Sequence, residues 1–274
     1  MGENRMKKQD LIIVRGAGDL ATGTICRLAK SGFRLLVLET VHPAAIRRQV
    51  ALSEAVYEGS ACVEGVTAVQ IEAVKEADAV WARGQVPVLV DPVGDAIRAL
   101  KPAAVIDAIL AKRNLGTTRA MAPLTIALGP GFTAGIDVDA VIETKRGHNL
   151  GRVITDGSAS PNTGIPGMIG GYAAERVLHA EAAGTLRNIR QIGDLVMAGE
   201  PIAAIETKDG SVSVKASISG LIRGLIRDGY PVTKGFKIAD IDPRSEELAN
   251  CFSISDKARC IAGGVLEVIC SRLE

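Results

Sequence analysis

Short apolar runs, each about as long as one β-strand, recur through the first half of the sequence. They are bounded by charged or turn-forming residues, which is typical of parallel strands that are covered on both faces. Between the first two runs, apolar residues recur at helical spacing from Leu20 to Ala29, and Gly32 supplies a stop. The pattern predicts an α/β region with strands at Leu11–Val14, Arg34–Leu38, Val86–Val90, Ala103–Ile106, Leu124–Leu128 and Ala140–Ile142.

A second pattern lies toward the C-terminus, where Ile192–Ile205 and Asp228–Ile241 resemble each other at an offset of 36 residues. Each copy predicts a strand, a glycine turn and another strand, so we expect a small all-β module with quasi-twofold symmetry. The pattern resembles the barrel-sandwich fold of biotinyl and lipoyl domains. Asp209 stands where those carriers display the modified lysine, and Lys208 comes one place early. We therefore expect an interaction or docking module without the carrier site.

Together these patterns predict an α/β fold in which a Rossmann-like parallel sheet is joined to a barrel-sandwich-like β module and a C-terminal helix. Ser255 or Asp256 is expected to cap that helix, and Gly263 and Gly264 within it indicate close packing on another element. The expected divisions are a Rossmann-like nucleotide-binding domain over 1–115, a continuation of the α/β region with glycine-rich and basic loops over 116–185, the β module over 186–243, and a helix over 244–274 that packs on the α/β region.

The first predicted strand leads directly into a glycine-rich turn. The sequence reads GxGxxA, in which the glycines permit a tight turn and close approach of a pyrophosphate, and the alanine lets the helix pack on the strand. Glu39 ends the second strand, where an acidic side chain accepts from a ribose hydroxyl. A purely structural turn is the alternative to this NAD(P)-type nucleotide site. The expected cofactor contacts are Arg15, Gly16, Gly18, Asp19, Leu20, Ala21 and Glu39.

Charged residues at the ends of the predicted strands could serve either a ligand or the fold itself. Arg15 would be costly to bury without an anion, so it either contacts a bound anion or reaches solvent or a carboxylate such as Asp19. Asp91 and Asp107 follow strands at the edge where ligands collect in open α/β sheets. Each could hold a metal or a hydroxyl, but capping a neighbouring helix is the commoner role, so neither is assigned to catalysis.

Three loops of small and cationic residues follow the later strands, at Gly129–Gly135, Glu143–Arg152 and Ser158–Gly167. The first offers backbone N–H groups for an anion, and the second holds three cations and a histidine. We expect either a phosphate or carboxylate ligand here or a solvated charged face. His148 alone is more typical of a hydrogen-bonded surface histidine than of a base or metal ligand. The candidate ligand contacts are Gly129, Gly131, Lys145, Arg146, His148 and Arg152.

Composition narrows the classes of protein and partner. Thirty-two basic and 31 acidic residues leave a net charge of +1, and aromatic residues make up 3% of the chain, so nothing favours a nucleic-acid or acidic-membrane partner. Five cysteines without a CxxC pair or a nearby histidine predict neither a disulfide framework nor a metal site. The polar N-terminus lacks a secretion signal and no apolar run could span a membrane, so we expect a cytoplasmic protein.

With these elements placed, the sequence resembles the YqeB-type accessory proteins of the selenium-dependent molybdenum hydroxylase system over nearly the whole chain. The N-terminal half is also similar to the Rossmann domain of the accessory proteins that mature xanthine dehydrogenase by delivering sulfurated molybdenum cofactor. The cysteine-bearing partner domain of those proteins is not evident here. The segments that carry the resemblance are Val14–Gly23, Gly129–Arg152, Asn162–Gly167, Ile238–Arg244 and Ile254–Arg259.

The resemblance implies a cytoplasmic role in maturing a molybdenum hydroxylase, with that enzyme or its maturation proteins as partners. The cofactor would be a molybdopterin nucleotide or an NAD-like dinucleotide, since phosphate suits glycine loops and cations. One alternative is an NAD-dependent oxidoreductase, although no Tyr/Lys or His/Asp constellation stands out to move a proton. Another is a nucleotide-sensing scaffold that docks a partner through the β module. No catalytic residue is assigned, enzymatic activity is left open, and a homo-oligomer is compatible with the sequence.

Overall fold

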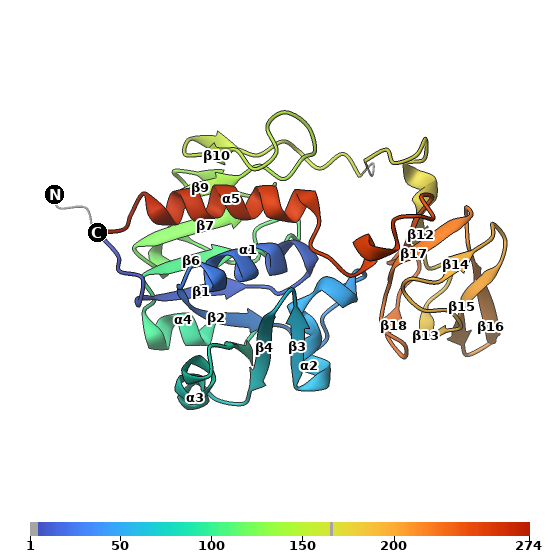
Figure 1. Cartoon of the computed structure of the whole chain (residues 1–274), viewed down its shortest axis with the longest axis horizontal. Helices are drawn as coiled ribbons and strands as arrows, with labels where there is room; N and C mark the ends of the chain where they lie inside the picture. Colours follow the sequence, from blue (N-terminus) through green and yellow to red (C-terminus); the bar gives the residue numbers. More distant parts are fainter. Residues whose placement is uncertain (1–4, 165–166) are drawn as a thin grey trace. The chain divides into compact units, whose positions relative to one another are not determined.

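The computed structural model describes residues 5–164 and 167–274 and divides the chain into two compact units. The first comprises the chain up to Pro43, Ala51–Thr163 and Ile254–Glu274, and it contains a large sheet with its helices (Figure 1). The second comprises Ala44–Val50 and Gly164–Ser253 and is built mainly from short strands. No helix in the described part of the chain is both long enough and apolar enough to cross a lipid bilayer.

The first unit is organised around one nine-stranded sheet. Its interior strands run parallel, whereas the strand at each edge pairs antiparallel with its neighbour. The central strands are buried because helices and loops cover both faces, which is why they appear in the sequence as unbroken apolar runs. Across the sheet the order is β10 (Val153–Ile154), β9 (Ala140–Ile142), β7 (Leu124–Leu128), β6 (Ala104–Asp107), β1 (Leu11–Arg15), β2 (Arg34–Glu39), β5 (Val86–Val90), β4 (Val66–Ile71) and β3 (Ser60–Val63).

Two long helices lie side by side on one face of this sheet, α1 (Asp19–Lys30) and α5 (Asp256–Cys270) (Figure 1). Their close approach requires a glycine, because a Cβ added to Gly23 would lie 2.8 Å from the Cβ of Ala258. The predicted cap of the last helix is confirmed, since Ser255 Oγ accepts a hydrogen bond from Ala258 N at 3.2 Å.

The opposite face is covered by α3 (Ala77–Ala82) and α4 (Asp95–Leu100), which share one apolar cluster with the sheet. The short helix α2 (Ala55–Glu58) precedes β3. A separate two-stranded sheet joins β8 (Thr133–Ala134) to β11 (Gly157–Ser158). The loops that follow β7 and β10 are therefore tied to each other beyond the end of the main sheet.

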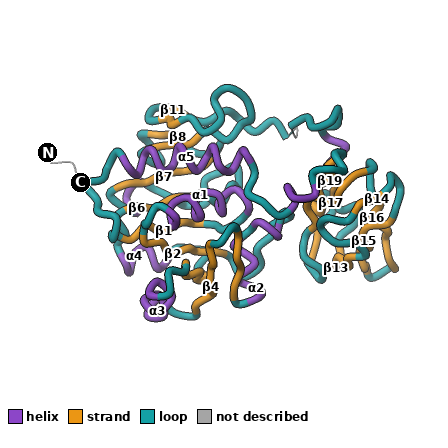
Figure 2. The backbone as a smooth tube through the Cα atoms, viewed as in Figure 1, coloured by secondary structure: helices purple, strands orange, loops and turns teal. Residues whose placement is uncertain are grey.

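The sheet is mixed and is not the Rossmann-like parallel sheet predicted from the sequence. The β3–β4 hairpin follows β2 in the chain, and it is β5 that pairs with β2. Among the described residues, the links from β6 to β7 and from β7 to β9 contain no α-helix. Figure 2 colours the helices of the chain purple and its strands orange. The hairpin was missed because its turn, Glu64–Gly65, adopts φ values of 47° and 80° without the Asn-Gly or Asp-Gly pair typical of such turns.

The second unit contains two four-stranded antiparallel sheets around one apolar core. The internal repeat predicted from the sequence is confirmed by matched roles: Val196 and Val232 are buried, and Gly199 and Gly235 both have φ of 83°. One sheet has the order β12 (Val177–His179), β19 (Lys237–Asp242), β17 (Gly220–Leu225) and β14 (Leu195–Val196), and the other β16 (Gly210–Lys215), β15 (Pro201–Thr207), β13 (Gly184–Asn188) and β18 (Pro231–Val232).

The predicted combination of a Rossmann-like unit with a barrel-sandwich module over 186–243 is wrong. Strand β12 precedes that range, and the segment 44–50, which follows β2 in the chain, also belongs to the second unit. Leu225 N donates to the carbonyl oxygen of Ile46 at 2.9 Å, and Arg48 Nε donates to the carbonyl oxygen of Leu225 at 2.9 Å. A local repeat cannot reveal such additions, because they come from distant parts of the chain.

Candidate functional site

The glycine turn after β1 is closed by the protein itself. Ala17 N donates to Glu39 Oε2 at 2.7 Å, and the carbonyl oxygen of Ala17 accepts from Ser53 N at 2.9 Å. A Cβ on Gly16 would lie 3.0 Å from the carbonyl oxygen of Ala108. The NAD(P)-binding interpretation is therefore wrong, because the carboxylate expected to hold a ribose is hydrogen-bonded to the turn. Burial raises the pKa of Glu39, although the N–H groups of Thr40 and Ala17 oppose that shift.

Arg15 and Asp107, at the ends of adjacent strands, form a buried network with Thr117. Arg15 Nη1 donates to Thr117 Oγ1 at 2.5 Å, and Thr117 Oγ1 donates to Asp107 Oδ2 at 2.5 Å. Arg15 thus reaches a carboxylate, but that carboxylate is Asp107 and not Asp19. Burial raises the pKa of Asp107 against the opposing effects of Thr117, Ile109 N and Arg15. The network binds three segments of the unit together and exposes almost no polar surface.

Asp91, at the end of β5, has the structural role favoured from sequence. Its Oδ1 accepts from Gly94 N at 2.8 Å and from Asp95 N at 3.0 Å, and its Oδ2 accepts from Ala96 N at 2.8 Å. These are the unpaired N–H groups at the start of α4. The side chain therefore fixes the loop that joins strand to helix.

The second glycine loop, after β7, also packs against protein. A Cβ on Gly129 would lie 2.6 Å from Thr144 Oγ1, and one on Gly131 would lie 2.6 Å from Arg113 Cα. Both glycines have positive φ, 77° and 108°. Their lack of a side chain is therefore explained by close approach of the neighbouring loops.

A cavity of about 500 Å³ is lined by residues that follow β9, from Glu143 to Pro161, and we call it the polar cavity. Glu143 forms part of its wall and holds two loops in place, because Oε1 accepts from Lys145 N at 2.7 Å and Oε2 from Ser160 N at 2.8 Å. Burial of Glu143 acts to raise its pKa, but these amide donors outweigh burial and lower it. The lining residues are Glu143, Asn149, Arg152, Val153, Ile154, Thr155, Asp156, Ser158, Ala159, Ser160 and Pro161.

Of the cations predicted to bind a ligand, Arg152 lines the polar cavity. Arg146 instead forms a bidentate pair with Asp256 at the start of α5, with N–O distances of 2.7 and 3.0 Å. The side chains of Lys145 and His148 are exposed. At the first turn, Gly18, Asp19 and Leu20 are partly exposed at the start of α1, whereas Ala21 is buried in the helix. The residues predicted to contact a ligand therefore do not form one site: Arg152 lines the polar cavity, and the others lie elsewhere in the first unit.

Lys257, in the first turn of α5, is a charged residue outside the set predicted from the sequence. Its side chain is partly buried, and loss of solvation lowers the pKa of its amine, as does the charge of Arg146. The carboxylates of Asp19, Glu143 and Asp256 oppose that shift. The run Ile254–Arg259, which carries part of the resemblance, was the signal that could have drawn attention to it.

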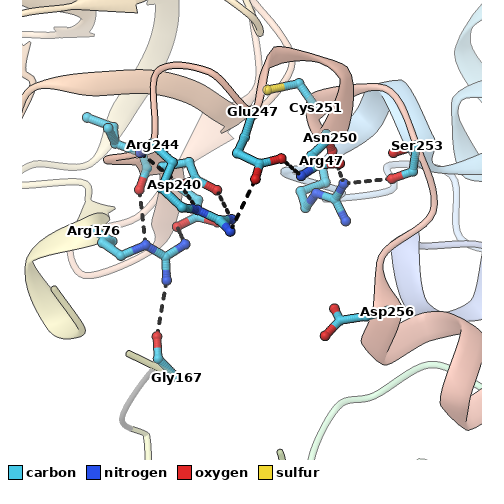
Figure 3. Close-up of polar contacts among 12 residues, drawn as sticks. Arg47, Gly167, Arg176, Asp240, Arg244, Glu247, Asn250, Cys251, Ser253 and Asp256 are labelled. Carbon is cyan, nitrogen blue, oxygen red and sulfur yellow. Dashed lines mark hydrogen bonds and ion pairs between the residues drawn. The ribbon is translucent and has the colours of Figure 1, made fainter. Parts of the chain in front are cut away.

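The second unit contains its own arginine–aspartate pairs, and Figure 3 shows the one between Arg176 and Asp240. Arg176 Nη2 donates to Asp240 Oδ1 at 3.0 Å and Arg176 Nη1 to the carbonyl oxygen of Gly167 at 3.2 Å. Arg244 pairs in a bidentate manner with Asp242 at 2.9 and 2.8 Å. Burial works to raise the pKa of Asp242, but Arg244 outweighs it and lowers the pKa. These contacts explain the charged residues of the Ile238–Arg244 run by structure alone.

Ile165 and Pro166 of the Asn162–Gly167 run lie outside the described residues.

Comparison with known proteins identifies a relative. No family model matches the chain. The protein YqeB of Escherichia coli (strain K12), described as uncharacterized, is 52% identical to it over 259 residues. Over this shared region the chain is similar to YqeB. The match covers 94% of this chain and 47% of that protein, so the chain spans about half the length of the curated YqeB that it matches.

Solved structures similar to this chain include the product-bound ectoine utilization protein EutE (DoeB) from Ruegeria pomeroyi. It is 10% identical, with 86% of each chain covered and a TM-score of 0.28. An aspartoacylase family protein from Mesorhizobium loti is 10% identical, with 87% of this chain and 86% of that chain covered and a TM-score of 0.28. At that TM-score they support no conclusion about the activity of this chain.

Proposed function

We propose that this protein is an accessory factor in the maturation of a molybdenum hydroxylase and that it holds a phosphate-bearing pterin, of the molybdopterin nucleotide type, in the polar cavity. One observation carries the proposal. The run Gly129–Arg152, the longest segment that resembles the accessory family, supplies Glu143, Asn149 and Arg152 to the cavity wall. The resemblance and the cavity therefore point to the same residues.

The residues of the polar cavity have the chemistry that such a ligand needs. Its volume of about 500 Å³ lies within the usual range for small-molecule sites. The Arg152 guanidinium suits a phosphate, because its planar N–H groups match phosphate oxygens. Asn149 and Asp156 offer the mixed donors and acceptors that a pterin edge requires. The pterin would carry the metal-binding chemistry, and this chain would bind and orient it.

Binding of a phosphorylated, oxidised pterin, which is fluorescent, tests the proposal. Titration followed by fluorescence and calorimetry should show saturable binding, with the dephosphorylated pterin bound about tenfold more weakly because it lacks the charged hydrogen bonds. Arg152→Met should reduce affinity for the phosphorylated form by about the same factor and leave the dephosphorylated form unaffected.

Arg83→Met is the matched control, since Arg83 is an exposed arginine of the same unit that bonds Gln85 at 2.9 Å and is not part of the cavity wall. It should change neither affinity. The proposal fails if the intact protein binds neither pterin, or if Arg83→Met and Arg152→Met weaken binding equally.

A further inference from the structure

A second cavity, of about 680 Å³, lies in the first unit alongside α4, and we call it the apolar cavity. Its wall is formed by α4 and by the segment that precedes β7. It shares no lining residue with the polar cavity, so binding of a ligand here does not depend on the proposed function. Its lining residues are Gly94, Ile97, Arg98, Lys101, Pro102, Thr118, Ala120, Met121, Ala122 and Pro123.

The chemistry of this wall is apolar with a cationic rim. Ile97 belongs to the core cluster of the sheet face, and Met121 and Ala122 pack against that cluster, so they extend apolar surface into the cavity. Arg98 and Lys101 are the charged residues of the wall, and no carboxylate lines it. Arg98 pairs with Asp95 on its own helix. Lys101 is exposed and makes no ion pair with any residue that the structure describes.

The end of α4 holds Lys101 in an unusual backbone conformation. Its φ and ψ are 45° and 64°, in the left-handed region that disfavours residues with a side chain. Its backbone N–H donates to the carbonyl oxygen of Ile97 at 3.0 Å, and the buried Pro102 follows. Such conformations persist where the surrounding structure holds them, and they cluster at ligand sites. The backbone of Lys101 is thus held at the rim of the cavity.

We infer that the apolar cavity binds a small amphipathic anion, an aliphatic or aromatic carboxylate, with its apolar body against Ile97, Met121 and Ala122 and its carboxylate at Lys101. The volume lies within the usual range for small-molecule sites. Charge selects the occupant: Arg98 is already paired with Asp95, so Lys101 is the cation that attracts an anion, and no wall carboxylate repels it. An amphipathic amine would meet the like charge of Lys101.

Three probes of equal chain length and different head groups test this inference: octanoate, octanol and octylamine. Calorimetry and saturation-transfer NMR on the full chain should show affinity in that order, with octanoate bound about tenfold more tightly than octanol, as expected for a charged hydrogen bond. Lys101→Met should abolish the difference between octanoate and octanol. Lys112→Met is the control, because Lys112 is also an exposed lysine with positive φ, 62°, and lies outside the cavity wall.

Filling the cavity separates specific binding from adsorption to the surface. Ala120→Phe, at an exposed wall position, should reduce the affinity for octanoate and octanol alike by at least about tenfold, and thermal unfolding verifies that the variant folds. Where Ala120→Phe does not fold, Ala122→Leu serves the same purpose. The inference is overturned if octanoate and octylamine bind equally, if Lys101→Met and Lys112→Met behave alike, or if the folded filled variant retains full affinity.

Discussion

The turn after β1 and the loop after β9 both resemble ligand sites in the sequence, but their structures differ in one respect. In the first, Glu39 binds Ala17 N at 2.7 Å and closes the turn. In the second, Glu143 binds Lys145 N and Ser160 N and leaves a cavity of about 500 Å³ between the loops that it holds. A carboxylate near a glycine loop can therefore either fill the ligand position or build its walls. The sequence pattern does not distinguish the two outcomes.

The greatest loss of stability should come from the buried network of Arg15, Thr117 and Asp107, which begins at the residue before the first glycine turn. Arg15→Met leaves Asp107 buried without its cation, which should lower the free energy of unfolding by about 3–5 kcal/mol. Urea unfolding measures the loss, and a double variant that adds Asp107→Asn should recover most of it. Lys7→Met, which removes an exposed pair with Glu274, is the control and should cost under about 1 kcal/mol. A small loss in Arg15→Met would show that Asp107 does not depend on Arg15 for its stability in the folded protein.

A smaller effect should appear at two adjacent glycines of α5, the helix that packs against the loop after β9 at Gly151. A Cβ on Gly264 would lie 2.2 Å from the carbonyl oxygen of Gly151, so Gly264→Ala should cost about 1–3 kcal/mol by overpacking. Gly263 has open space around it, and Gly263→Ala should stabilise the helix by up to about 1 kcal/mol. Thermal unfolding of both variants checks the opposite signs. Equal effects would mean that α5 does not position the loop at Gly151.

The weakest effect is a difference in pH dependence between Glu39 and Glu143. The pKa of Glu39 is raised from 4.5, mainly by burial, so its stabilising contribution is present below its unfolded pKa and is lost as pH rises through its folded pKa. Glu143 has a lowered pKa, so its contribution is present above its unfolded pKa and is lost as pH falls through its folded pKa. Relative to the unmodified protein, Glu39→Gln should therefore gain stability as pH rises, and Glu143→Gln should lose it.

Urea unfolding of the two glutamine variants from about pH 4 to about pH 7 measures these slopes. Asp10→Asn provides a control, since this partly exposed carboxylate shares the first unit. Slopes of the same sign for Glu39→Gln and Glu143→Gln would contradict the assignment of one carboxylate to burial and the other to its amide donors.

Much of the first sheet could be predicted because its strands are local apolar runs. The strands predicted at Leu124–Leu128 and Ala140–Ile142 are found with the same bounds as β7 and β9. Strand order could not be predicted, because it depends on the hairpin after α2 and on links that lack α-helices. Periodicity describes one element at a time, whereas the order of strands depends on which elements pack together.

The residues of the candidate site were also predicted only in part, because their positions depend on packing between segments that are distant in the chain. Arg152 lies in a cavity wall, but Arg146 was already bound to Asp256, which is 110 residues away in the chain. The burial that lowers the pKa of Lys257 likewise depends on packing that no local pattern shows. Residue type left open either an anion ligand or a solvated charged face, and only the fold could show which of these cations lines a cavity.

The decisive experiment compares pterin phosphate binding to Arg152→Met and Gly18→Ala. Gly18 has φ of −63° and no atom within 4 Å of an added Cβ, so an alanine there keeps the fold but obstructs the first turn to a ligand. If the polar cavity is the site, calorimetry will show affinity reduced about tenfold in Arg152→Met and unchanged in Gly18→Ala. Loss of binding in Gly18→Ala with full binding in Arg152→Met would contradict the assignment of the ligand to the polar cavity.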